Sequence, residues 1–196
     1  MERKRKNRNR NAIRSEKMLM DAYVSLLMEL PAEKITVTAI VDRAGMNRST
    51  FYAHFGCPAD VYDVLEQKLV DELLERIDGL NLEGVMTNPK PLLETVSRLV
   101  EERHEYVKLM LSTNKAARWM ESMKEAIIRK FVTDSETAGL YKDQEILMVN
   151  LRFFIGGYIA LCRDWLSGKI ERPLCDLTEL LSGTIAVGLA SGASKE

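Results

Sequence analysis

Apolar residues between residues 12 and 30 recur at the spacing of one helix face. They are Leu19, Ala22, Tyr23, Leu26, Leu27 and Leu30. A period of about 3.6 residues is that of an amphipathic α-helix, and Pro31 is expected to stop it. Residues 1–11 have almost no apolar content and no period, so we expect a disordered arm there.

Two short helices are predicted next, on either side of a tight turn. Thr36 stands in the cap position of a helix over residues 37–44, where its hydroxyl can accept from a free backbone N–H. Gly45 can adopt the positive φ that a tight turn requires. A very short third helix is expected to begin at Asn47 or Arg48.

The rest of the chain is also predicted to be helical. Pro58 suits the first turn of a helix over residues 57–79, because a missing N–H costs little there. Residues 80–91 carry glycine, asparagine and proline and are expected to be a domain junction. Further helices are predicted over residues 92–102, 105–112, 116–132, 145–166 and 174–189, with loops at 133–142 and 167–173. No pair of strands is predicted, so the expected fold class is all-α.

Charge divides the chain into a basic head and an acidic body. Residues 1–56 hold 11 Lys or Arg and 6 Asp or Glu, and residues 57–196 hold 17 and 23. The arm alone has six basic side chains, Arg3, Lys4, Arg5, Lys6, Arg8 and Arg10. A basic head suggests contact with a polyanion, although a solvated, solubilising tail would have the same composition.

Composition excludes several classes of protein. The three cysteines, Cys57, Cys162 and Cys175, are too widely spaced for a disulfide framework or a zinc pattern, and a reducing cytoplasm is expected. We expect no metal and no cofactor. The apolar run of residues 153–162 is too short to cross a bilayer, and the basic N-terminus lacks the apolar region of a secretory signal. No catalytic set is recognisable, so no enzyme is expected.

The most informative stretch is ITVTAIVDRAGMNRSTFYAHF, residues 35–55. Ile40, Ala44, Met46 and Phe51 are spaced so that the two short helices can pack against each other. The exposed positions of the second helix carry hydrogen-bonding side chains. Two such helices have a known physical role, in which the first braces the second and the second presents its N-terminal residues to the DNA major groove.

This stretch resembles the DNA-binding signature of the TetR/AcrR family of bacterial regulators. The matching core runs from Ala44 to Phe55 and includes Gly45, Asn47, Thr50 and Tyr52. The resemblance extends over about residues 12–77, and residues 153–181 are similar to the last helix pair of one TetR-like subgroup. It implies a three-helix, homeodomain-like helix-turn-helix domain over residues 12–56. A helical regulatory and dimerisation domain is implied over residues 80–196.

By this resemblance, specific side chains contact DNA. Arg48 and Ser49 are expected to reach base edges, with Thr50 close by, although Arg48 can instead touch only phosphate. Tyr52 and His54 are expected to bond phosphates, and the alternative for His54 is an ordinary surface histidine. Asn47, Thr36 and Thr38 lie at the starts of the two short helices, and both threonines can donate to phosphate; Thr36 can instead be only a cap. The arm can enter the minor groove or add only nonspecific charge.

The sequence departs from the family at the start of the fourth helix. Members often carry a lysine there that reaches a phosphate, whereas this chain has Cys57 and Pro58. Backbone N–H groups at that helix start can still hold a phosphate.

A dimer and an effector are also expected. The helix over residues 145–166 is apolar nearly all round, so it must be covered on every side. With the helix over residues 174–189, it is predicted to form a two-fold four-helix interface. Candidate effector-pocket residues, each equally explicable as core, are Tyr106, Met110, Trp119, Met123, Phe131 and Phe154.

The sequence therefore predicts a dimeric regulator of transcription that binds a near-palindromic operator, with repression as the main expectation. The effector is a small molecule in this reading. The alternative is a regulator, or an activator, that a protein partner controls. A closed apolar void of a few hundred Å³ would favour a small ligand, and a filled core would favour a protein.

Overall fold

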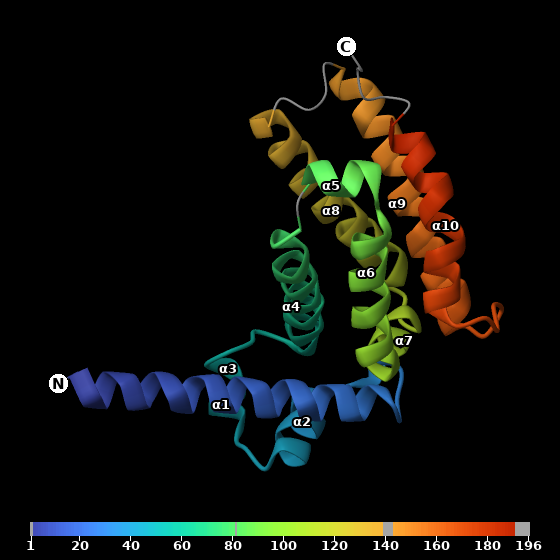
Figure 1. Ribbon diagram of the computed structural model, residues 1–196. Helices are drawn as coiled ribbons and strands as arrows, with labels where there is room; N and C mark the ends of the chain where they lie inside the picture. Colours follow the sequence, from blue (N-terminus) through green and yellow to red (C-terminus); the bar gives the residue numbers. More distant parts are fainter. Residues whose placement is uncertain (1, 81, 139–142, 191–196) are drawn as a thin grey trace. The chain divides into compact units, whose positions relative to one another are not determined.

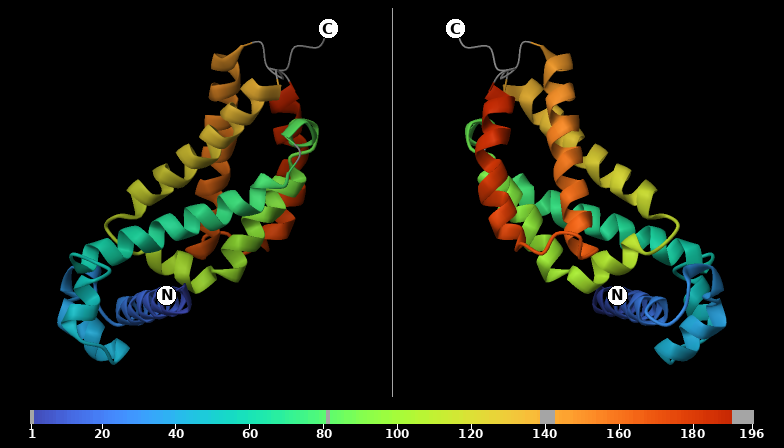
Figure 2. Two further views of the ribbon diagram at one scale, coloured as in Figure 1. Left: turned by 90° about the vertical axis from the view of Figure 1, so that its left-hand side faces the viewer. Right: turned by 90° about the vertical axis from the view of Figure 1, so that its right-hand side faces the viewer.

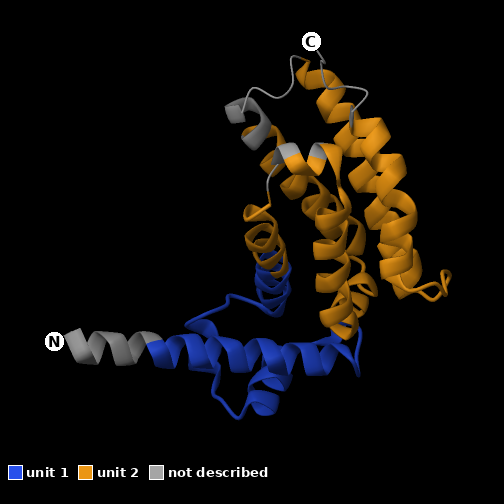
Figure 3. Cartoon of the chain, viewed as in Figure 1, with its two compact units in different colours: residues 1–68 blue, residues 69–196 orange. Residues whose placement is uncertain are grey.

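The chain is made of helices and turns. The structure, a computed structural model, describes residues 2–80, 82–138 and 143–190, and no strand occurs in those ranges. The predicted all-α class is confirmed. Two compact units, residues 1–68 and 69–196, divide the chain (Figure 3). Their boundary lies inside helix α4 (Pro58–Asp78), the helix expected to connect the two domains.

Unit 1 is built on its first helix. Helices α2 and α3 both pack on α1, as Figure 1 shows. The elements before α4 are α1 (Glu2–Leu27), the 3₁₀ turn η1 (Ala32–Lys34), α2 (Val37–Ala44) and α3 (Arg48–Tyr52). The side chains with the least exposure in this unit are Leu19, Tyr23, Ile40, Phe51, Val61 and Tyr62. The apolar face predicted for residues 19–27 is therefore the centre of the unit.

The N-terminal arm differs from the expectation of disorder. The backbone of residues 2–11 is helical, because α1 begins at Glu2. Lysine and arginine are good helix formers, and extending an existing helix gains one hydrogen bond per residue without a new nucleus. The side chains of residues 1–9 lie outside the described part, so the expected groove contacts of the arm stay a prediction.

Local signals fixed the two short helices as predicted. The Thr36 hydroxyl accepts from the Ala39 N–H at 3.2 Å at the start of α2. Gly45 ends α2 with a φ of 64°, in the left-handed region. Asn47 is the cap of α3, and its side chain accepts from the Thr50 N–H at 2.8 Å.

Unit 2 contains the second half of α4 and six further helices. Helix α10 lies against α5, α6 and α9, and α8 lies against α9 (Figures 1 and 2). These helices are α5 (Leu82–Thr87), α6 (Lys90–Glu102), α7 (His104–Leu111), α8 (Ala116–Ala138), α9 (Gln144–Leu166) and α10 (Leu174–Ala190).

Two predicted loops differ from the structure. The expected domain junction contains the helix α5, which packs against α8 and α10 and buries Val85. The glycine and prolines in this stretch predicted a loop and gave no sign of the helix. The loop expected over residues 133–142 is helical in its first part, because α8 continues to Ala138. Residues 139–142 lie outside the described residues.

A buried cluster of three hydroxyls joins α6, α9 and α10. The Tyr158 hydroxyl lies 2.5 Å from Ser97 Oγ and 2.8 Å from Thr178 Oγ1, and the latter two are 3.0 Å apart. Ser97 also donates to the Leu93 carbonyl, and Thr178 donates to the Leu174 carbonyl. A fully bonded polar cluster in an apolar core favours one register among the helices that supply it.

The Gly45 turn gives a direct stability test. Gly45→Ala should lower the free energy of unfolding by about 1–2 kcal/mol, because a Cβ is disfavoured at positive φ. A Cβ meets no atom within 4 Å at either Gly45 or Gly79, and Gly79 does not have a positive φ. Gly79→Ala is therefore the matched control, and urea denaturation measures both. Equal losses in the two variants would contradict the backbone explanation.

Candidate nucleic-acid interface and cavities

One side chain of helix α3, Phe51, is buried in unit 1, and the polar side chains of the helix face outward. Phe51 is completely buried, whereas Arg48, Ser49 and Tyr52 are exposed and Thr50 is half-buried. The ring of Phe51 contacts that of Tyr52 edge-on at a centroid distance of 5.6 Å. Burial of one side chain thus aims the rest of the helix outward.

The side chains at the start of α3 form one hydrogen-bonded group. Asn47 Oδ1 accepts from Ser49 Oγ at 2.7 Å and from Thr50 Oγ1 at 3.0 Å, in addition to the Thr50 N–H. Arg48 Nη2 donates to Thr38 Oγ1 on α2 at 2.6 Å. The structure therefore brings together five of the eight residues expected at DNA: Thr38, Asn47, Arg48, Ser49 and Thr50.

The other three residues predicted to contact DNA lie apart from this group, each in different surroundings. Thr36 is exposed and caps α2, which is the alternative that the sequence left open. Tyr52 projects with 58% of its surface exposed. His54 is half-buried, and its Nε2 lies 2.8 Å from Ser15 Oγ on α1, so this ring is tied to the first helix.

An ion pair that the sequence analysis missed braces α2 against α1. Arg43 Nη1 and Nη2 donate to the two carboxylate oxygens of Glu29 at 3.0 and 2.8 Å, and Nη1 also donates to Ser25 Oγ at 2.5 Å. Hydrogen bonding from the Arg43 guanidinium lowers the pKa of the Glu29 carboxyl. Bidentate geometry fixes the orientation of a guanidinium, so the pair holds the register of α2 on α1. No sequence signal links a residue in the turn after α1 with one on α2, 14 residues further along the chain.

The start of α4 differs from the expectation of free N–H groups. Asp60 Oδ2 accepts from the Gly56 N–H at 2.8 Å and from the Cys57 N–H at 3.2 Å. The Cys57 thiol donates to Asp60 Oδ1, and this bond, with the two backbone bonds, lowers the pKa of the carboxyl. Asp60 therefore already occupies the N–H groups of the two residues that precede α4. Its position three residues after Cys57 is the capping spacing that could have revealed this.

Two small apolar cavities lie inside unit 2. The first measures about 40 Å³ and is lined by α5, α6, α8, α9 and α10. The second measures about 60 Å³ and is lined by α4, α6, α7, α8 and α9. Val96, Ile127 and Ile159 line both cavities and separate them.

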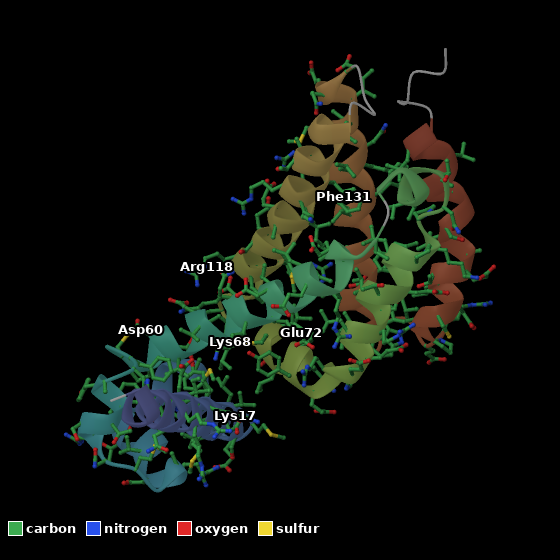
Figure 4. All side chains as sticks on the ribbon, turned by 60° about the vertical axis from the view of Figure 1, so that its left-hand side comes forward. Lys17, Asp60, Lys68, Glu72, Arg118 and Phe131 are labelled. Atoms are coloured by element: carbon green, nitrogen blue, oxygen red, sulfur yellow. The ribbon has the colours of Figure 1, made fainter. Side chains whose placement is uncertain are left out.

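The expected effector-pocket residues divide between these cavities. Phe131 and Phe154 line the first, and Trp119 and Met123 line the second. Met110 is buried and Tyr106 half-buried, and both lie outside the two linings. Figure 4 labels Phe131 on α8, together with Asp60, Lys68 and Glu72 along α4.

Trp119 has a buried donor without an acceptor. Its side chain is 3% exposed, and Nε1 makes no hydrogen bond. A buried, unsatisfied donor of this kind costs about 1–3 kcal/mol. Among the described side chains, Gln144 Oε1 and Asn150 Nδ2 are also buried without a partner, and neither residue lines either of the two cavities.

Helices α9 and α10 expose large apolar side chains. The exposed fractions are 60% for Val149, 74% for Phe153, 70% for Leu180 and 75% for Val187. By length and composition α9 is also apolar enough to cross a membrane, and only 22% of its most apolar window is buried. Exposed apolar side chains grouped on one pair of helices are typical of an interaction surface.

Within the described part of the chain, no group of three or more His, Cys, Asp or Glu side chains is arranged to hold a metal ion.

Comparison with known proteins identifies the fold. No known family matches the sequence, and no curated protein does. Several solved structures do match. One is a "tetR-family transcriptional regulator" from Streptomyces coelicolor, which is 15% identical in sequence and superposes with a TM-score of 0.62. The match covers 91% of this chain and 82% of that chain. The chain has the TetR-regulator fold.

Two further structures of this fold cover more of both chains. The dihydroxyacetone kinase operon activator DhaS has 16% identity and a TM-score of 0.67, with 93% of this chain and 99% of that chain covered. NalD, a repressor of a multidrug efflux pump in Pseudomonas aeruginosa, has 16% identity and a TM-score of 0.65, with coverages of 95% and 99%. The TetR-regulator fold thus extends over nearly the whole chain.

The cap of α3 can be tested by substitution. Asn47→Ala should lower the free energy of unfolding by about 0.5–2 kcal/mol, because the Thr50 N–H loses its acceptor. Asn47→Asp keeps a capping oxygen and is the control, with little change expected. Urea denaturation followed by circular dichroism measures both, and an unchanged Asn47→Ala midpoint would show that the cap does not stabilise the unit.

Proposed function

We propose that this protein is a DNA-binding regulator of transcription that binds a near-palindromic duplex site as a homodimer. The observation that carries the proposal is the polar face of α3, which the buried Phe51 holds outward. A helix presented in this way fits the major groove, where side chains near its N-terminus reach base edges. The resemblance of residues 44–55 to the TetR/AcrR signature and the TetR-regulator fold support the same function.

Each DNA contact has a proposed role. Arg48, Ser49 and Thr50 read bases, and Arg48 exchanges its bond to Thr38 for a guanine, as arginine does most often. Thr36, Thr38 and Tyr52 bind phosphates and fix the register. Asn47 organises the group through its cap.

His54 contributes to phosphate binding from its place beside Ser15 on α1. The basic arm supplies charge that the segment before α4 does not, because Asp60 accepts from the Gly56 and Cys57 N–H groups there.

The proposed dimer uses the apolar surface of α9 and α10. Gly157 and Gly183 are exposed, and a Cβ built on either meets nothing within 4 Å. These glycines are therefore not needed for packing inside the chain, and they allow a second copy to approach closely. A two-fold axis through such a surface would place two α3 helices for a near-palindromic site.

Regulation has two candidate forms. In the first, a small molecule in unit 2 lowers DNA affinity and the protein is a repressor, as NalD is named. The cavities beside Phe131 and Trp119 support this form. In the second, a protein partner controls an activator, which the small cavity volumes and the name of DhaS support. The proposed location is the cytoplasm.

Selection of bound sequences from random duplex DNA tests the proposal. We expect a near-palindrome and an affinity that falls steeply with salt, because phosphate contacts release counterions. Arg48→Ala should reduce the difference in binding free energy between the preferred base and the other bases at one position by about 1–3 kcal/mol. Arg43→Lys is the control, because Arg43 bonds Ser25 and Glu29. Equal losses on selected and random duplexes would remove Arg48 from base reading.

The arm is tested by deleting residues 2–10. Binding should weaken by a similar factor on selected and unrelated duplexes, and the salt slope should become shallower because fewer phosphates are neutralised. Fluorescence anisotropy at several salt concentrations measures both. A loss confined to the selected sequence would instead assign the arm to sequence reading.

The dimer surface is tested with Phe153→Arg. The substitution should convert the dimer to monomer, because an arginine at the interface would be an unpaired charge removed from water. Sedimentation velocity measures the oligomeric state. Met28→Arg, in the turn after α1, is the control, because Met28 is also exposed, at 69%. A wild-type monomer, or an unchanged Phe153→Arg dimer, would overturn this part of the proposal.

A further inference from the structure

An open polar cleft lies between α1 and α3 in unit 1. Its volume is about 790 Å³, and its lining comes from α1, the Gly45 turn and α3. Asn47, Ser49 and Thr50, which the proposed function places at DNA, belong to this lining, so the cleft borders the proposed DNA surface. Within the described lining, His54 is the single ionisable side chain.

The hydroxyl protons of the cleft are already in use. Ser49 Oγ and Thr50 Oγ1 both donate to Asn47 Oδ1, at 2.7 and 3.0 Å. Ser15 Oγ donates to the Ala12 carbonyl at 2.9 Å. A hydroxyl has one proton, so each of these three groups offers only lone pairs to a further partner. A phosphate oxygen is an acceptor, and in this arrangement the hydroxyls give it no donor.

Ser15 fixes which nitrogen of the His54 ring carries the proton. His54 Nε2 lies 2.8 Å from Ser15 Oγ, and the Ser15 proton is directed at the Ala12 carbonyl. Both hydrogen bonds exist together only when the ring donates from Nε2. A neutral imidazole has one N–H, so Nδ1 of the neutral ring then carries a lone pair.

The second ring nitrogen, Nδ1, is open to solvent. It has no hydrogen-bond partner in the part of the chain that the structure describes. The buried side-chain atoms without a partner in that part belong to Trp119, Gln144 and Asn150, so Nδ1 of His54 is not a buried atom. Its lone pair would repel a phosphate oxygen, whereas the N–H of an imidazolium would donate a charge-assisted hydrogen bond to it.

No other charge faces the His54 ring across the described lining of the cleft. The charged and titratable residues nearest in the chain, which lie outside the lining, are Arg10, Arg14 and Glu16 on α1, Arg48 and Tyr52 on α3, and Cys57 and Asp60 beyond it. Glu16 bonds Lys68 at 2.8 Å, and Asp60 bonds the two N–H groups before α4. A phosphate is therefore the anion that can pair with a charged His54 in this cleft.

We propose that Ser15 is a positioning residue that makes DNA binding by this protein take up a proton at His54. Ser15 holds the neutral ring with its N–H toward α1, so Nδ1 donates to a DNA phosphate only after it gains a proton from solvent. The Ser15 bond stays intact, and each chain gains one positive charge at the duplex. The inference rests on the proposed function, because the phosphate belongs to the bound duplex.

Fluorescence anisotropy of the full chain with its selected duplex, at one salt concentration, measures the proton uptake. The pH is varied from about 5.5 to about 7.5, where histidine ordinarily changes its charge. Because the bound state holds more protons, the affinity should fall as the pH rises. The fall should be about tenfold for each chain on the duplex, as for a hydrogen bond to a charged group. An affinity independent of pH would overturn the proposal.

Ser15→Ala separates positioning from a structural role. Without Ser15 the neutral ring can turn an N–H toward the phosphate. The tenfold change per chain should then shrink to about threefold, because a neutral donor keeps roughly half of the bond strength. A structural Ser15 would instead weaken binding by one factor at every pH. That result, with the pH dependence unchanged, would overturn the positioning role.

The two histidines of the chain provide a matched pair of variants. His54→Gln should remove the dependence of the affinity on pH, because glutamine does not titrate. His104→Gln changes the histidine of unit 2 and should leave that dependence as it is in the wild type. A dependence that survives in His54→Gln, or that is lost in His104→Gln, would overturn the assignment to His54.

The position of the ring proton is measured without DNA. Long-range ¹H–¹⁵N NMR of the full chain, above the pH range in which histidine titrates, distinguishes a protonated from an unprotonated ring nitrogen, and His104→Gln assigns the signals. We expect the proton of His54 on Nε2, and a proton on Nδ1 would overturn the proposal. A chain that binds no duplex at any pH would overturn the proposed function and this inference together. Duplex binding that ignores pH would overturn the inference alone.

Discussion

The presentation of α3 depends on the burial of one side chain. A helix of five residues is far below the length at which an isolated helix is stable in water, about 12–15 residues. Phe51 is completely buried, and its ring contacts that of Phe55 at 5.6 Å. The Asn47 cap and the Gly45 turn add local restraint at the other end. The helix therefore exists because unit 1 holds it, and its exposed polar residues are displayed by that packing.

Exposed ion pairs orient this framework more than they stabilise it. Arg43 on α2 bonds Glu29 in the turn after α1, and Lys68 bonds Glu16 between α4 and α1 at 2.8 Å. Glu16 is half-buried and the other three side chains are exposed, and surface pairs of this kind contribute about 0–1 kcal/mol. The bidentate geometry of the first pair fixes a helix register, while the energy comes from the apolar side chains beneath.

Unit 2 contains two features that a single chain leaves unsatisfied. Phe153 and Val187 expose apolar surface, and the indole N–H of Trp119 is buried without an acceptor. The first cost would be relieved by covering the surface, and the second by a hydrogen-bond acceptor beside the indole N–H.

The sequence by itself determined what depends on near neighbours. The Thr36 cap, the positive φ of Gly45 and the start of α4 at Pro58 follow from a few adjacent residues, so they were predictable. Tertiary structure alone decided features that depend on distant residues. These are the bond between His54 and Ser15, the bracing of Arg43 on Glu29, the folding of α5 against α8 and α10, and the orphaned donor of Trp119. The physical reason is that a cap or turn is satisfied within one helical turn of the chain, whereas burial and long-range hydrogen bonds depend on which helix surfaces meet.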